Sequence, residues 1–133
     1  MTKITEKIKN IPNLFTSPGA SAVEIKQAED KLGLAFSQEF KEYLEAYGQI
    51  SFKNTEWMGL NSDDFCDVVL MTVEARQTYS DFPLDKYIVE DLHFDDNLIL
   101  SDCDGKIYHW HSAKEEILYS SLIDYLEECL ARE

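Results

Sequence analysis

The sequence predicts a single α+β domain, in which a mostly antiparallel β-sheet has helices packed on one face. Two short helical segments with capping residues lie back to back between residues 21 and 48. Several strand-like segments joined by turn residues follow, and a last helical segment ends the chain. A length of 133 residues, of which 44% are hydrophobic, suits one globular domain, so we assign residues 1–133 to it.

Residues 1–20 are predicted to form an amino-terminal helix and a loop. Ile4, Ile8 and Ile11 recur at helical spacing before Pro12, which cannot continue a helix. The run 16–19 consists of residues that favour turns. This loop leads the chain to the helical segment that follows.

Two capped helices are predicted within residues 21–48. Ser21 and Glu24 have the spacing of a capping box, so the first helix begins directly after Ser21. Gly33 can adopt the left-handed conformation that closes this helix. Ser37 then caps a second helix, which Gly48 ends. The apolar stripes consist of Ile25, Ala28 and Leu32 in the first helix and Phe40, Tyr43, Leu44 and Tyr47 in the second.

Short strands and turns are predicted between residues 49 and 111. The segments 49–52 and 56–60 flank Lys53-Asn54 and fit a β-hairpin. The segment 68–79 is compatible with a strand or a helix, and its helix formers favour a helix from about Thr72. Asp104-Gly105 is predicted to supply a tight turn. We further expect strands at 87–90, 98–101 and 107–111, and a final helix from about Ser121.

Nine positions in the first two helical segments resemble the amino-terminal signature of the SUKH superfamily, the Smi/Knr-like domains. Three later segments, 67–76, 104–108 and 121–126, resemble the later parts of that family in the same order. Ser37 stands where such domains commonly have Pro, and both residues suit a helix start. The resemblance implies an α+β domain that in most bacterial members is an immunity protein against a secreted or contact-delivered toxin. The nine positions are Ile25, Glu29, Leu32, Gly33, Phe36, Phe40, Tyr43, Leu44 and Gly48.

The charge balance restricts the partners that this chain can bind. Twelve Lys and Arg residues against 26 Asp and Glu residues give a formal net charge of −14. Such a charge repels phosphate backbones and anionic lipids, so neither nucleic acid nor a membrane is an expected partner. No apolar run approaches the ~20 residues that span a bilayer, and the amino terminus lacks a signal-peptide core. We therefore expect a cytoplasmic protein.

The sequence offers few groups for catalysis or metal binding. His109 and His111 alternate along a predicted strand, and with Asp102 or Cys103 they could in principle bind a transition metal. We interpret both histidines as partly exposed side chains beside Trp110. No enzyme activity, metal or cofactor is therefore predicted.

The cysteines do not indicate a disulfide framework. Cys66, Cys103 and Cys129 are odd in number and lack CxxC spacing. Free cysteines are among the most buried residue types, so we expect all three to be small buried side chains.

Acids between residues 81 and 104 are the candidates for a surface that binds a partner. Lys86 is the only Lys or Arg before Asp104 in this segment, so its acids would attract a basic protein. A solvated surface that keeps the protein soluble accounts for the same acids. Trp57 and Trp110, near predicted strand ends, are expected to be partly exposed and could anchor an interface. The candidate interface residues are Trp57, Asp81, Asp85, Glu90, Asp91, Asp95, Asp96, Asp102, Asp104 and Trp110.

Two hypotheses about function follow from these patterns. The first is an immunity protein, or antitoxin, that neutralises a cognate toxin, expected to be a basic domain of the nuclease type. The second is a non-enzymatic regulatory or scaffolding domain that binds a protein or peptide through the concave face of its sheet. A neighbouring reading frame for a large protein with a toxic carboxy-terminal domain would favour the first. The sequence leaves the toxin's reaction and the oligomeric state open.

Overall fold

The structure, a computed structural model, describes residues 2–132. These residues form five α-helices, one 3₁₀ helix (η1) and seven β-strands. In chain order the elements are α1 (Lys3–Lys9), β1 (Phe15–Thr16), α2 (Ala22–Leu32), α3 (Gln38–Tyr47), β2 (Ile50–Phe52), β3 (Thr55–Glu56), η1 (Asp64–Cys66), α4 (Val68–Thr78), β4 (Tyr87–Asp91), β5 (Leu98–Ser101), β6 (Ile107–His111), β7 (Lys114–Tyr119) and α5 (Leu122–Leu130).

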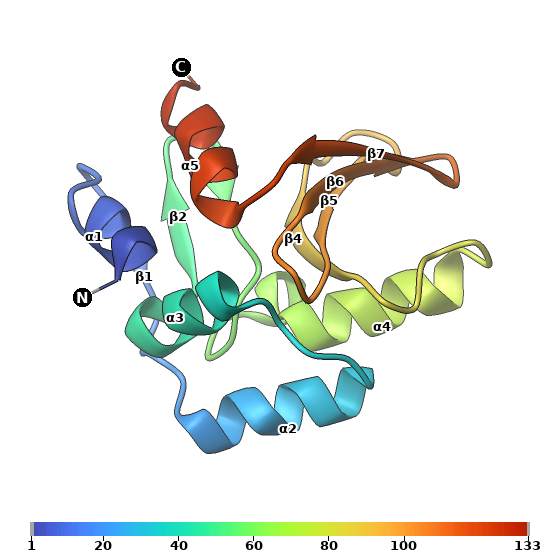
Figure 1. The fold of residues 1–133 in the computed structure, drawn as a ribbon, viewed down its shortest axis with the longest axis horizontal. Helices are drawn as coiled ribbons and strands as arrows, with labels where there is room; N and C mark the ends of the chain where they lie inside the picture. Colours follow the sequence, from blue (N-terminus) through green and yellow to red (C-terminus); the bar gives the residue numbers. More distant parts are fainter. Residues whose placement is uncertain (1, 133) are drawn as a thin grey trace.

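The strands form two antiparallel sheets. One has the order β1-β2-β3 and the other the order β4-β5-β6-β7. Figure 1 shows the larger sheet curving above α4, while α1 and α5 lie beside the smaller sheet and α2 lies beneath α3 and α4. The backbone N–H of Met58 donates to the carbonyl of Val89 at 2.7 Å and joins the two sheets. The predicted α+β fold with antiparallel strands is confirmed, and its strands are divided between two sheets.

The predicted helix ends in residues 21–48 are confirmed. Ser21 and Glu24 form both hydrogen bonds of the capping box. Gly33 has φ = 67° and ψ = 31°, the left-handed conformation that closes α2. The side chain of Ser37 accepts a hydrogen bond from the N–H of Phe40 and caps α3. These elements begin and end where short-range hydrogen bonds satisfy the free backbone groups of the helix ends.

Two predicted boundaries in the middle of the chain were wrong. Helix α4 begins at Val68 rather than near Thr72, because one carboxylate oxygen of Asp67 accepts the N–H groups of both Val69 and Leu70. Strand β3 ends at Glu56 rather than at residue 60. The chain leaves the hairpin there to reach the second sheet, as the hydrogen bond of Met58 shows.

The tight turn of the larger sheet lies elsewhere than predicted. Asp104-Gly105 belongs to a five-residue connection between β5 and β6, in which Gly105 has φ = 90°. The two-residue turn instead joins β6 to β7 at Ser112-Ala113, where φ is 51° and 64°. Strand β7 itself was not predicted, and neither was β1.

One hydrophobic core holds the helices against the sheets. It includes Leu126 of α5 and every apolar position predicted for α2 and α3, such as Leu44, except Tyr47, which is partly buried against the core. Cys66 and Cys129 are buried as expected, whereas Cys103 is exposed because it lies in the connection between β5 and β6. The prediction that all three cysteines are buried was therefore wrong for Cys103.

Candidate functional site

Trp57 and Trp110 are core residues, so the expectation that they are partly exposed was wrong. Their exposed fractions are 0% and 2%. The ring of Trp57 lies between those of Tyr43 and Tyr125, with centroid distances of 5.4 Å and 6.1 Å. Trp110 packs against Tyr79 and Phe82 in the segment that follows α4. Neither tryptophan can anchor a partner without unfolding of its surroundings.

Glu90 does not belong to the candidate surface either, because only 3% of it is exposed. Its carboxylate accepts a short hydrogen bond from the hydroxyl of Tyr125, and Arg132 Nη1 donates to Oε2 at 2.8 Å. The same guanidinium donates to Thr55 and Tyr125 at 3.0 Å each. A buried carboxylate needs such partners because desolvation of a charge is costly. Glu90 is therefore a structural residue, contrary to its prediction as an interface residue.

The surroundings of this network disfavour further ionisation. Burial raises the pKa of Tyr125 far above its usual value, and Cys129 and Glu90 add to this shift. Burial also raises the pKa of the Cys129 thiol to about 11. The network thus combines one carboxylate and one guanidinium with neutral neighbours at ordinary pH.

The acids that remain are divided between two ends of the larger sheet. At the first end, which we call the turn end, the connection between β4 and β5 meets the turn between β6 and β7. Strand β5 has four residues, and a strand rises about 3.3 Å per residue, so its opposite end lies about 10 Å away. The predicted single acidic stretch is thus two groups. Asp81, Asp91, Asp95 and Asp96 belong to the turn end, and Asp85, Asp102 and Asp104 to the opposite end.

Asp96 is a structural acid of the turn end. Its Oδ2 accepts the N–H of Ser112 at 3.0 Å, and its Oδ1 lies 2.6 Å from His111 Nδ1. Desolvation would raise the pKa of Asp96, but the Ser112 N–H and the His111 charge outweigh it and lower that pKa. Asp81 lines the same hollow as Asp96, which has a volume of about 360 Å³.

Phe94 lies at the turn end as a large exposed aromatic side chain that sequence reasoning missed. Its exposed fraction is 57%. The flanking residues His93 and Asp95 have left-handed φ values of 60° and 51°, and the carbonyl of Phe94 accepts both the N–H and the amide of Asn97. This loop therefore presents Phe94 next to the exposed Asp95. The only sequence signal was a lone aromatic residue inside a polar, acidic loop.

The acids at the opposite end surround Lys86 and Tyr108. Asp102 accepts the Tyr108 hydroxyl at 2.7 Å, and Lys86 Nζ lies 3.3 Å from both Asp85 and Glu115. Burial and the Asp102 carboxylate raise the pKa of Tyr108. Much of the negative charge at this end is thus engaged by a neighbouring lysine or hydroxyl. The turn end keeps more of its acids available to a partner.

The two histidines do not meet the other proposed metal ligands. Their rings are parallel with centroids 6.4 Å apart, His109 Nε2 lies 2.6 Å from Asn97 Oδ1, and His111 faces Asp96. Asp102 lies at the other end of β5 and contacts Tyr108. Within residues 2–132, no group of three or more His, Cys, Asp or Glu side chains is arranged to hold a metal ion.

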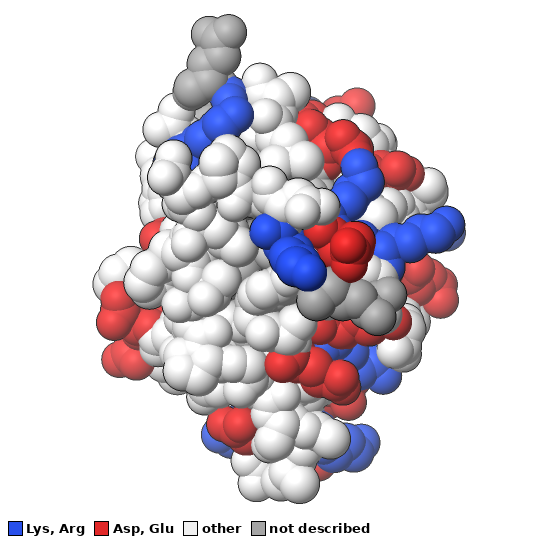
Figure 2. Space-filling view, turned by 90° about the vertical axis from the view of Figure 1, so that its left-hand side faces the viewer, with Lys and Arg blue, Asp and Glu red and all other residues white. Residues whose placement is uncertain are grey.

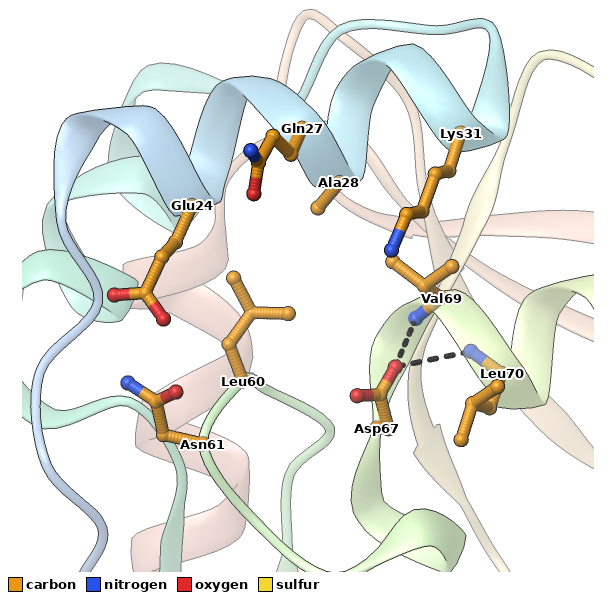
Figure 3. Close-up of a pocket in the computed structure, with 9 residues that line it drawn as sticks. All are labelled: Glu24, Gln27, Ala28, Lys31, Leu60, Asn61, Asp67, Val69 and Leu70. Atoms are coloured by element: carbon orange, nitrogen blue, oxygen red, sulfur yellow. Dashed lines mark hydrogen bonds between the residues drawn. The ribbon is translucent and has the colours of Figure 1, made fainter.

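A further hollow of about 360 Å³ lies between α2 and the start of α4. Figure 3 shows Glu24, Gln27 and Lys31 of α2 facing Asp67 and Asn61 across it. The carboxylates of Glu24 and Asp67 already cap the two helices. Their arrangement is accounted for by helix capping, so we assign this hollow no functional role.

Comparison with known proteins identifies the family of this α+β domain. A family model described as SMI1-KNR4 cell-wall, of the group SUKH_6, matches residues 23–126. The chain belongs to this family, and the resemblance to the SUKH superfamily is confirmed. SUKH domains are in general non-enzymatic immunity proteins, and membership is consistent with such a role. No curated protein matches the chain significantly. Among the described residues, no helix is both long and apolar enough to cross a bilayer.

Proposed function

We propose that this chain is a cytoplasmic immunity protein that binds and neutralises a cognate toxin with a basic surface. Membership of the SUKH superfamily over residues 23–126 carries this proposal. The net charge of −14 supports a basic partner, since opposite charges accelerate association. The chain acts by binding alone and performs no chemistry on the toxin.

The turn end is the proposed contact surface. Asp81 and Asp95 are exposed, Asp91 is half-buried, and Phe94, next to Asp95 in the chain, has 57% of its surface exposed. Exposed acids attract a basic surface over a Debye length of about 8 Å at physiological salt. An aromatic side chain that becomes buried in the interface then slows dissociation. Phe94 takes the anchoring role that the sequence had suggested for the two tryptophans.

The first experiment tests neutralisation. Where a neighbouring reading frame encodes a large protein with a toxic carboxy-terminal domain, that domain is expressed in cells with and without the chain. Survival only in the presence of the chain supports the proposal. Death in both cultures, together with no complex between the purified proteins, contradicts it and favours the regulatory or scaffolding hypothesis.

The second experiment tests the surface by association kinetics with the same toxin domain. The variant D81N/D91N/D95N should associate several-fold more slowly and show a weaker salt dependence. The control variant E6Q/D30N/E45Q removes the same number of charges from exposed positions in α1, α2 and α3. Equal association rates for the two variants would show that only net charge matters and that the turn end is not the contact surface.

Phe94→Ala should instead change the dissociation rate. Truncation of an anchor costs about 2 kcal/mol or more of binding, which is at least about 30-fold in affinity. Because Phe94 is largely exposed in the free protein, its truncation should leave the melting temperature nearly unchanged. An unchanged dissociation rate would exclude Phe94 as an anchor.

A further inference from the structure

The outer face of the smaller sheet consists of exposed and half-buried side chains. Phe15 of β1 pairs with Ser51 of β2, which pairs with Glu56 of β3. Residues paired directly across antiparallel strands share one face of a sheet, so these three side chains form a row. The neighbouring positions Ile50 and Phe52 are buried on the inner face. Phe15 is 60% exposed, which is unusual for a large apolar residue in a strand.

A second exposed aromatic side chain stands opposite this row. Phe65 of η1 is 59% exposed, and it lines the same groove as Phe15. Backbone hydrogen bonds from Gly59 to Cys66 and from Val68 to Gly59 hold η1 in place, at 2.8 Å and 2.9 Å. The groove has a volume of about 470 Å³. It therefore has aromatic side chains on two separate elements and a polar floor that includes Ser51.

Among the described residues, those that line the groove include two carboxylates and no Lys, Arg or His side chain. The carboxylates belong to Glu56 and Asp63. Both act on the thiol of Cys66 beside them: burial, a hydrogen bond with Glu56 and the charges of Glu56 and Asp63 raise its pKa to about 12. Among residues 2–132, neither carboxylate forms an ion pair with Lys, Arg or His. The negative charge of the groove is thus available to a ligand.

The surroundings of β1 are unusually poor in charge for so acidic a chain. Residues 10–23 contain no Asp, Glu, Lys or Arg. Figure 2 shows a broad surface without charged side chains, with both acidic and basic side chains along its margins. Two carboxylates beside a neutral surface attract a cation locally, whereas the acids of the turn end act as a diffuse field.

We propose that the groove between Phe15 and Phe65 is a docking site for an arginine side chain of a protein partner. A guanidinium group can stack on the face of an aromatic ring and donate paired hydrogen bonds to a carboxylate. Lysine presents a compact, strongly hydrated charge and uses a flat aromatic groove less well. The neutral surface around the groove suits the uncharged neighbours of that arginine. The partner that supplies this arginine is not required to be a toxin.

The test is a titration of the ¹⁵N-labelled full chain with the peptide acetyl-Gly-Arg-Gly-amide at physiological salt. We expect the largest amide shifts at Phe15, Ser51, Glu56 and Phe65. The citrulline analogue has the same shape without charge, and it should bind at least about threefold more weakly, as should the lysine analogue. Largest shifts at Asp91 or Asp95 would overturn the proposal, because they would indicate only diffuse attraction.

Variants of the groove complete the test. Phe15→Ala and Glu56→Gln should each weaken binding of the arginine peptide by at least about threefold. Asp95→Asn at the turn end is the matched control and should leave the affinity unchanged. Thermal melting checks that each variant is folded, which we expect because both altered side chains project from the outer face of the sheet. Equal affinities for Phe15→Ala and the parent would overturn the proposal.

Discussion

Arg132 is expected to stabilise the fold by neutralising the buried carboxylate of Glu90, and Arg132→Met tests this role. Removal of one partner from a buried ion pair costs about 3–5 kcal/mol, because the other charge is left without compensation. Arg132 is not fully buried, since 22% of its side chain is exposed. Water therefore screens part of the loss, and we expect about 2–3 kcal/mol. That is a large share of the ~5–15 kcal/mol that stabilises a typical domain.

Urea unfolding followed by tryptophan fluorescence measures this loss. Trp57 and Trp110 are both buried, so their emission reports exposure of the core. The midpoint of Arg132→Met should fall while the dependence on urea stays constant. The control is Lys26→Met, because Lys26 pairs with Asp30 on the exposed face of α2. Loss of such a surface pair should cost less than about 1 kcal/mol.

A double-mutant cycle separates the ion pair from general loss of packing. Glu90→Gln keeps a group that can accept from the Tyr125 hydroxyl but carries no charge. In that background Arg132→Met should cost less than in the parent, with a coupling energy of about 1 kcal/mol or more. Costs that simply add, or a loss below about 0.5 kcal/mol for Arg132→Met, would refute the assigned role of Arg132.

Three other predictions concern the core, the histidines and alkaline pH. Leu44→Ala and Leu126→Ala, at fully buried positions, should each cost about 2–5 kcal/mol in urea unfolding; melting like that of the parent would mean that the core is wrongly assigned. Replacement of His109 and His111 by Asn should preserve folding and neutralisation; loss of a stoichiometric metal together with function would instead indicate a metal site. Above about pH 9 the unfolded chain releases the Cys129 proton, while the folded state holds it up to about pH 11. The free energy of unfolding should therefore decrease as the pH rises through this range. Cys129→Ala should make this decrease smaller, as measured by urea unfolding at pH 8 to 10.5.

Helix ends could be predicted because their determinants are local. Ser21 and Glu24 are three residues apart, and so are Ser37 and Phe40, which form the cap of α3. A hydrogen bond within one turn depends little on the rest of the fold. Asp67 caps α4 by the same rule, but the β-branched residues after it obscured the helix start. The predicted start of α4 was four residues too late, because helix propensity was given more weight than the cap at Asp67.

Contacts between residues far apart in the chain determine the features that sequence patterns did not predict. Glu90 and Arg132 are 42 residues apart, and no local pattern indicates that this one acid among its neighbours is buried. Strand β7 pairs with β6 through the turn at Ser112-Ala113, although its first residues are charged and lack alternation. The burial of both tryptophans depends likewise on rings from distant elements. Sequence patterns thus predicted the helices and strands more reliably than they predicted which side chains are exposed.

The exposure of Phe94 follows from loop geometry rather than from residue size. The N–H of Leu92 donates to the carbonyl of Asn97, and the N–H of Asn97 donates to that of Phe94. These bonds close the connection between β4 and β5 with Phe94 at its tip, whereas Leu92 packs against the core. A tryptophan in a strand is covered by the helices and strands around it, whereas a phenylalanine at such a loop tip has no element to cover it. A binding surface on this fold should therefore be sought at loop tips and at the outer face of the smaller sheet. Kinetics separate attraction by charge from anchoring by an aromatic side chain, since loss of the turn-end acids slows association whereas loss of Phe94 or Phe15 speeds dissociation.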